Sequence, residues 1–268
     1  MRFLKVGGIV FGALLITTLG ISASDTLRGN ANSLLGQIAR SEQEGACPVG
    51  MTQVAVGQTF SCVDTYEASP AEACPDGAPA TMQDTQANLN EFDCTPESEA
   101  GARPWTYVTR SQAQTLCARA GKRLPTSAEW YTFAVGTPDS TKVCNVESNN
   151  MAPTGDYPEC ISAAKIFDAV GNVWEWTVDD VIEGNYNNRA LPSEGFVTQV
   201  DSDGVATVTD TAPSEEFSAD YFWNQRNGAY GMLRGGFFGS GEDAGVYAVH
   251  TKTVPTAATV AIGFRCVR

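Results

Sequence analysis

Residues 233–268 read LRGGFFGSGEDAGVYAVHTKTVPTAATVAIGFRCVR, and this stretch decides the fold of the chain. Its ends, LRGG at 233–236 and GFRC at 263–266, enclose a middle that is rich in glycine, alanine, threonine and other small residues. Such a composition is typical of exposed loops. The ends therefore carry information about the scaffold, and the middle carries information about what the scaffold presents to solvent.

Length and charge limit the class of protein. The chain has 268 residues and is 43% hydrophobic, which is enough for one large domain or two small ones. It carries 17 basic and 31 acidic residues, for a net charge of −14. This charge repels phosphate backbones, so we expect no nucleic-acid partner. An acidic balance is typical of simple solubility, and ion binding is the alternative.

The N-terminal segment predicts export. Arg2 and Lys5 precede an apolar run of about fifteen residues, followed by small residues. We predict a signal peptide or an N-terminal anchor over 1–24, and this anchor is the only membrane contact that we expect. Residues 25–45 predict a stalk or linker with a short amphipathic helix. Residues 46–268 then form the domain, located in the periplasm, on the cell surface or outside the cell.

Eight cysteines, an even number in an exported chain, indicate a disulfide framework. Local spacing favours Cys47–Cys62, Cys74–Cys94 and Cys144–Cys160, which leaves Cys117 and Cys266. Spacing does not fix the connectivity, since eight cysteines allow about a hundred pairings. The single histidine, His250, excludes a Cys/His zinc cluster and a three-histidine iron site.

Two capping boxes predict two short helices in tandem. TRSQ at 109–112 begins the first helix, which ends at Gly121, and TSAE at 126–129 begins the second, which ends at Gly136. We interpret Glu129 as a side chain that caps the helix rather than as a catalytic acid.

The remaining sequence has little helical periodicity and is rich in turn-forming residues. It predicts short strands joined by loops. Residues 71–103 and 180–230 are predicted as surface insertions, the first acidic and rich in proline and alanine, the second rich in Asn, Asp and Gly.

Five sequence blocks stand in the order found in a known family: FSCVDTYEASP at 60–70, CARAGKRLPTSAEW at 117–130, GNVWEWTVD at 171–179, LRGG at 233–236 and GFRC at 263–266. Together they resemble the formylglycine-generating enzyme, or sulfatase-modifying factor, domain over residues 46–268. The resemblance implies an irregular C-type-lectin-like fold of the α+β class, loop-rich with short strands. It also implies a Cys117–Cys266 disulfide, because the family pairs the cysteine before AGKRLP with the one in GFRC.

The catalytic residues of that family are missing. Its enzymes bind copper(I) through two cysteines that follow RGGS, and they oxidise a substrate cysteine to formylglycine. Here the serine position is Phe237, and the cysteine positions are Ser240 and Gly245. Because copper(I) needs soft thiolates, we predict no copper, no catalytic residue and no formylglycine generation. An oxidoreductase with altered active-site chemistry is the alternative.

The resemblance further implies a structural calcium ion in the loop at 168–175. Its ligands would be two carboxylates and two backbone carbonyls, from Asp168, Glu175, Gly171 and Val173. Oxygen donors of this kind suit a hard cation. A tight turn followed by a strand that buries Trp174 and Trp176 explains the same residues without calcium.

The C-terminal segment also resembles the variable region of retroelement-diversified proteins, which display changeable residues between RGG and GFR. Residues reachable from Asn codons by adenine-directed mutagenesis are Phe238, Gly239, Ser240, Asp243, Tyr247, His250, Thr251 and Thr253. We therefore predict a non-catalytic ligand-binding or display domain whose surface lies in 237–262, with an unknown protein or carbohydrate ligand. An ordinary fixed loop with its own ligand, and a structural accessory that oligomerises through the stalk, are the alternatives.

Overall fold

The computed structural model describes residues 47–54 and 58–268. Residues Pro48–Arg268 form one compact unit. The predicted signal peptide and stalk lie outside the described residues. Within the described residues, no helix has the length and apolar character needed to cross a membrane.

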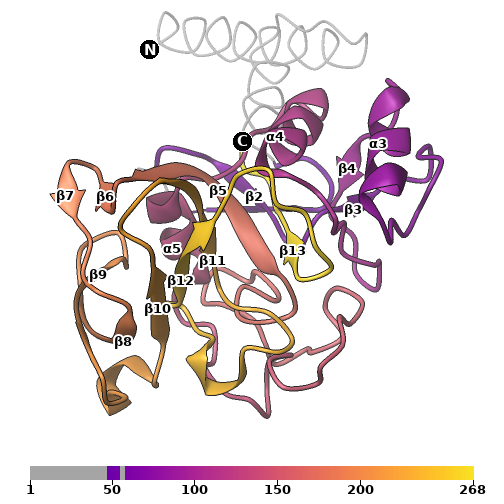
Figure 1. Cartoon of the computed structure of the whole chain (residues 1–268). Coiled ribbons are helices and arrows are strands. Elements are labelled where there is room, and N and C mark those ends of the chain that lie inside the picture. Colours follow the sequence, from indigo (N-terminus) through magenta and orange to yellow (C-terminus); the bar gives the residue numbers. More distant parts are fainter. Residues whose placement is uncertain (1–46, 55–57) are drawn as a thin grey trace, which may run out of the picture. The chain divides into compact units, whose positions relative to one another are not determined.

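One curled sheet organises this unit (Figure 1). Its strands are β5 Trp174–Ile182, β6 Asn185–Tyr186, β7 Arg189–Ala190, β8 Gly195–Val200, β9 Ala206–Asp210, β10 Tyr221–Asn224, β11 Ala229–Arg234, β12 Val249–Thr253 and β13 Ile262–Gly263. Their order is β7-β6-β5-β11-β12-β10-β8-β9, and β13 pairs with β5. The β10–β12 and β13–β5 pairs are parallel, and the other pairs are antiparallel.

Shorter elements surround the sheet. Two small sheets pair β1 Met51–Gln53 with β2 Cys62–Asp64 and β3 Ser69–Pro70 with β4 Pro96–Glu97. The helices are α3 Met82–Asn90, α4 Arg110–Arg119 and α5 Ser127–Ala134, and single 3₁₀ turns are η1 Glu215–Phe217 and η2 Gly241–Asp243. The sheet and the helices together give the predicted α+β architecture.

Both predicted capping boxes are confirmed. The amide of Gln112 donates to Thr109 Oγ1 at the start of α4, and the amide of Glu129 donates to Thr126 Oγ1 at the start of α5. The Glu129 carboxylate accepts from the Thr126 amide at 2.9 Å and from both Nη atoms of Arg123. Burial alone would raise the pKa of Glu129, but these hydrogen bonds lower it to about 2. The structural interpretation of Glu129 is therefore correct.

The disulfide framework ties distant segments together. Cys74–Cys94, Cys117–Cys266 and Cys144–Cys160 are formed, and Cys47 and Cys62 are also disulfide-bonded. Because the other six cysteines pair among themselves, these two form the fourth predicted bridge. Cys117–Cys266 joins α4 to the end of the chain over 149 residues, a span for which the chain-entropy model gives about 5 kcal/mol. Four disulfides indicate an oxidising compartment.

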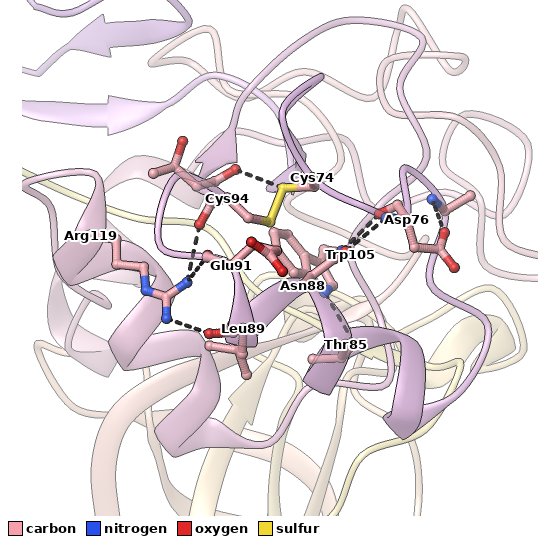
Figure 2. Close-up of a disulfide and its surroundings, with 11 residues drawn as sticks. Cys74, Asp76, Thr85, Asn88, Leu89, Glu91, Cys94, Trp105 and Arg119 are labelled. Atoms are coloured by element: carbon pink, nitrogen blue, oxygen red, sulfur yellow. Dashed lines mark hydrogen bonds between the residues drawn. A yellow bond between two sulfur atoms is a disulfide. The ribbon is translucent and has the colours of Figure 1, made fainter.

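The predicted surface insertion at 71–103 contains α3 and is fixed at several points (Figure 2). The Cys74–Cys94 bridge encloses α3, and Trp105 Nε1 donates to Thr85 Oγ1 of this helix at 3.1 Å. Arg119 Nη2 donates to a carbonyl oxygen near the end of α3 at 2.6 Å. These contacts, which the figure shows around the disulfide, make the segment an ordered part of the domain.

The prediction of a surface insertion at 180–230 is wrong, because this segment supplies strands β6 to β10 of the main sheet. A hydrophobic cluster is built largely from it: Val181, Tyr186, Leu191, Val197, Val205, Ala206, Phe217, Phe222, Met232 and Val249. The strands are short and are separated by turns, including Asn187 and Asn188 at φ +50° and +61°. Turn-forming residues therefore dominate the composition and hide the strands.

Candidate binding site

The C-terminal end of the segment at 233–268 is held by a buried ion pair. Arg265 Nε donates to the two carboxylate oxygens of Glu175 at 2.7 and 2.8 Å, and Trp130 Nε1 donates to Glu175 Oε2 at 2.7 Å. Arg265 and Glu175 are buried. The WEW glutamate and the GFR arginine therefore form one ion pair that joins β5, α5 and the C-terminal end of the chain.

Glu67 holds the loop that contains Asn172 and Val173. Its carboxyl oxygens accept from Asn172 Nδ2 at 2.6 Å and from the Val173 amide at 3.2 Å. Burial, together with the nearby charges of Asp168 and Glu175, raises the pKa of Glu67 well above its ordinary value. Glu67 lies in the block at 60–70, and sequence reasoning assigned it no role.

The predicted calcium ligands are brought together only in part. Asp168 is buried with φ +55°, and its Oδ2 accepts from the Gly155 amide at 2.6 Å. Burial raises the pKa of Asp168 to about 6. Both oxygens of Glu175 are already bonded to Arg265 and Trp130, so this carboxylate does not face an open position.

Across the described residues, no group of three or more His, Cys, Asp or Glu side chains is arranged to hold a metal ion. Of the two predicted side-chain ligands, Asp168 is therefore the one that is not hydrogen-bonded to Arg265. Calcium stays a prediction. The strand that follows the loop does bury Trp174 and Trp176, as the calcium-free interpretation requires.

Ser240 and Gly245, at the positions of the family's two catalytic cysteines, make other contacts. Ser240 Oγ accepts from the Phe237 amide at 3.0 Å. A Cβ atom at Gly245 would lie 1.8 Å from Asp220 Oδ1, so the Asp220 carboxylate occupies the place of the second cysteine side chain. All eight cysteines are disulfide-bonded, and none in the described part of the chain is free. The site therefore contains no thiol.

The eight predicted ligand-binding residues do not form one surface. Phe238 is 9% exposed and Thr251 is completely buried, so neither side chain lies on an open surface. Gly239, Ser240 and Asp243 lie on or beside η2 and reach solvent. Retroelement diversification stays a prediction for the residues that reach solvent.

The other predicted residues divide between two environments. Tyr247 packs against Tyr131 and Phe217, with ring centroids 5.8 and 5.1 Å apart. His250 and Thr253 lie on β12, and Thr253 Oγ1 is 3.1 Å from His250 Nδ1. Of the predicted set, His250 therefore has the most informative surroundings.

His250 belongs to a row of half-buried rings that crosses three strands. Phe196 on β8 contacts Tyr221 on β10 with centroids 5.1 Å apart, and Tyr221 contacts Trp223 at 4.9 Å. Trp223 in turn contacts His250 on β12 at 5.8 Å. The buried ring of Trp174 supports Trp223 and His250 at 5.4 and 5.7 Å. We call Phe196, Tyr221, Trp223 and His250 the aromatic row.

Charged groups lie at the edge of the aromatic row. Lys252 Nζ donates to Glu194 Oε2 at 2.8 Å, and both side chains are about one-third exposed. Burial raises the pKa of Tyr221, and the carboxylates of Glu194 and Asp243 raise it further. Burial and Lys252 lower the pKa of His250 to about 4, so its ring is neutral at neutral pH.

Sequence reasoning missed three members of the aromatic row because they lie in the segment predicted as an insertion. The sequence YFWN at 221–224 contains the available signal. In β10 the side chains alternate, with Tyr221 and Trp223 half-buried and Phe222 and Asn224 buried. Two aromatic residues with a period of two indicate a strand that presents rings on one face.

Comparison with known proteins agrees with the five sequence blocks. The family described as sulfatase-modifying factor enzyme 1-like domain matches residues 48–268. The chain therefore belongs to this family. Its α+β fold, C-type-lectin-like and rich in loops, is as predicted.

Individual relatives are more distant. Hercynine oxygenase of Mycolicibacterium smegmatis is 28% identical over 156 residues, which are 52% of this chain and 31% of that protein. Serine/threonine-protein kinase Pkn1 of Chlamydia trachomatis is 27% identical over 176 residues, 62% of this chain and 24% of that protein. The chain thus spans less than a third of the length of these curated relatives.

Several solved structures align with most of this chain at low sequence identity. PvdO from Pseudomonas aeruginosa has 14% identity and a TM-score of 0.45, covering 81% of this chain and 90% of that one. Treponema denticola variable protein 1 has 14% identity and a TM-score of 0.41, covering 82% and 99%. The P3c variant of Major Tropism Determinant has 15% identity and a TM-score of 0.43, covering 83% and 56%.

Proposed function

We propose that this chain is an exported, non-catalytic binding domain whose aromatic row contacts a protein or carbohydrate ligand. The observation that carries the proposal is the row itself: four half-buried rings on β8, β10 and β12, with charged groups at the edge. Aromatic side chains supply large contact area at low conformational cost, and the surrounding polar groups supply orientation.

The rigid support of the row favours binding. Trp174 packs beneath Trp223 and His250, and the β10–β12 register pairs Trp223 with His250 directly. Side chains held in this way lose little freedom when a ligand binds, which increases affinity.

The test uses Trp223→Ala in the disulfide-bonded domain, with Phe92→Ala as the matched control. Phe92 is 83% exposed and lies outside the aromatic row. Labelled protein is applied to a glycan array and to intact cells treated with protease or periodate, which separate protein from carbohydrate ligands. We expect Trp223→Ala to lower affinity about tenfold or more, as for a central interface residue. Equal binding by the two variants would contradict the proposal.

The competing function is an oxidoreductase with altered chemistry. The absence of a free thiol among the described cysteines argues against thiolate-bound copper, and Asp220 fills the second cysteine position. Oxygen uptake by purified protein, measured with a thiol peptide and added copper or iron, distinguishes the two functions. We expect no uptake above the protein-free reaction, and thiol-dependent uptake would replace the binding function with an enzymatic one.

A further inference from the structure

Asn227 and Gly228 form the only Asn-Gly pair in the sequence. Such a pair ordinarily marks the two-residue turn of a β-hairpin, in which both residues have positive φ. Here the pair lies between β10 and β11, which are not neighbours because β12 separates them in the sheet. Of the two residues, only Gly228 has a positive φ, of +112°. A hairpin turn therefore does not account for the asparagine.

Gly228 has a structural reason of its own. Its φ is one that L side chains rarely adopt, and a Cβ atom at this position would lie 3.0 Å from Tyr230 Oη. Asn227 is exposed and has neither constraint. Its side chain can therefore turn toward the Gly228 amide nitrogen, which no Cβ atom shields.

Glu183, in the turn between β5 and β6, is held against the Gly228 peptide by two hydrogen bonds. The Glu183 amide donates to the Gly228 carbonyl oxygen at 2.8 Å, and Glu183 Oε1 accepts from the Gly228 amide at 3.1 Å. Asn185 Nδ2 donates to the Glu183 carbonyl oxygen at 2.8 Å and fixes the turn. A carboxylate oxygen is thus in contact with the amide nitrogen that follows Asn227.

A hydrogen-bond donor lies on the oxygen of the same peptide group. Tyr230 Oη donates to the carbonyl oxygen of Asn227 at 2.9 Å. Because hydrogen bonds in a chain polarise one another, this contact draws electrons from the peptide nitrogen and makes the N–H of Gly228 more acidic. The peptide between Asn227 and Gly228 therefore has a donor on its oxygen and a proton acceptor on its nitrogen.

We propose that Asn227 is a site of self-modification, in which the Gly228 amide nitrogen attacks the side-chain carbonyl carbon of Asn227 with Glu183 as general base. Glu183 takes the amide proton as the new bond from nitrogen to carbon forms, and it returns a proton to the departing amino group, which leaves as ammonia. The product is a cyclic imide, a succinimide. Water then opens either of its two carbonyl groups and gives aspartate or isoaspartate.

The complete reaction consumes one water molecule and releases one ammonia, without an oxidant or a cofactor. Both products carry a new carboxylate beside Glu183, and isoaspartate also lengthens the backbone between β10 and β11 by one carbon. Because β10 carries Tyr221 and Trp223, the modification alters the connection that follows the strand bearing these rings.

The first test compares the folded chain with the unfolded chain. The full disulfide-bonded protein is incubated at neutral pH in water labelled with heavy oxygen, beside the reduced and denatured protein. Mass spectrometry of the peptide that contains residue 227 measures the label, which enters when the imide opens. We expect Asn227 to react about tenfold faster in the folded protein, since a positioned general base contributes at least that much.

The second test removes the general base. Glutamine at position 183 can accept the hydrogen bond from Gly228 but takes no proton, so Glu183→Gln should slow the reaction about tenfold or more. The control is Glu215→Gln, which removes the same charge at an exposed position on η1 and should react as the wild type does. Thermal unfolding checks that both variants are folded.

Two results would overturn the proposal. One is a reaction at Asn227 that is no faster in the folded wild type than in the denatured protein, as for an Asn-Gly pair without a positioned base. The other is an unchanged rate in folded Glu183→Gln.

Discussion

Glu175 and Asp220 are both buried carboxylates beside the same sheet, but their partners are opposite in charge. Glu175 accepts hydrogen bonds from Arg265 and Trp130, and its charge is compensated within the chain. Asp220 accepts one amide hydrogen bond and faces a second acid, Asp139. A buried charge is tolerated only when it is paired or protonated. The first site therefore stabilises the scaffold as an ion pair, whereas at the second site burial and Asp139 raise the pKa of Asp220 and favour its protonated form.

The contrast between Glu175 and Asp220 also distinguishes the C-terminal end of the 233–268 segment from its middle. Arg265 lies in the GFRC block, which belongs to the family scaffold. Asp220 contacts Gly245 in the middle, where the family enzymes carry a cysteine. The space beside Gly245 is thus filled by the Asp220 carboxylate, while the ion pair that holds the C-terminal end of the segment is complete.

The largest expected effect comes from breaking the compensated site. Arg265→Met leaves Glu175 buried without its cation, and we expect a loss of about 3–5 kcal/mol in the free energy of unfolding. Urea denaturation followed by tryptophan fluorescence measures it. Arg123→Met is the matched control, because Arg123 pairs with Glu129 but is 47% exposed, and it should cost about 1 kcal/mol or less. Similar losses in both variants would show that burial does not distinguish the two ion pairs.

The sequence predicts those parts of the molecule whose signals are local or carried by motifs. The capping boxes at Thr109 and Thr126 depend on residues three positions apart, so the start of each helix is readable. The Cys117–Cys266 bridge follows from the family blocks, and the local spacing of the other cysteines indicated their pairs.

The proximity of Asp139 to Asp220 and the aromatic row both depend on tertiary contacts, which no local sequence pattern predicts. Asp139 and Asp220 belong to separate loops that meet only through the fold. Phe196 and Tyr221 are paired by the β8–β10 register, and Trp223 and His250 by the β10–β12 register. Thr251 is likewise buried where β12 pairs with β10, and its hydroxyl bonds to Trp223 and Asn224, so the resemblance to a variable region did not predict its position.

A smaller effect on the free energy of unfolding is expected at Asp139, which lies beside Asp220, and this effect depends on pH. The pKa of Asp139 is raised by burial from 3.8 to about 6 in the folded state. Its contribution to stability is therefore fully present below about pH 4 and is lost as the pH rises through about 6. Because asparagine does not titrate, Asp139→Asn should gain stability relative to wild type over this interval, by about 3 kcal/mol.

Urea denaturation of both proteins at several pH values between about 4 and 8 measures this gain. Asp93→Asn, which removes an exposed charge, should follow the wild-type curve. A difference between Asp139→Asn and wild type that stays constant with pH would mean that the two acids do not share a proton. The contrast between Glu175, which is paired with a cation, and Asp220, which is paired with an acid, would then fail.

The smallest expected effect is that of calcium on stability. It tests whether the charge of Asp168, like that of Glu175, is balanced by a cation. We propose that Asp168 and the carbonyls of Gly171 and Val173 hold the ion, since Arg265 is committed to Glu175 and only partly balances Asp168. Calcium at about ten times its dissociation constant would add about 1.4 kcal/mol to the free energy of unfolding. The measurement is thermal unfolding in Ca²⁺ and in EGTA, with Mg²⁺ as the ion control and Asp168→Asn as the variant that should abolish the difference. An equal unfolding temperature in Ca²⁺ and EGTA for the wild type would leave Asp168 as a buried acid held by protonation, which would place it with Asp220 rather than with Glu175.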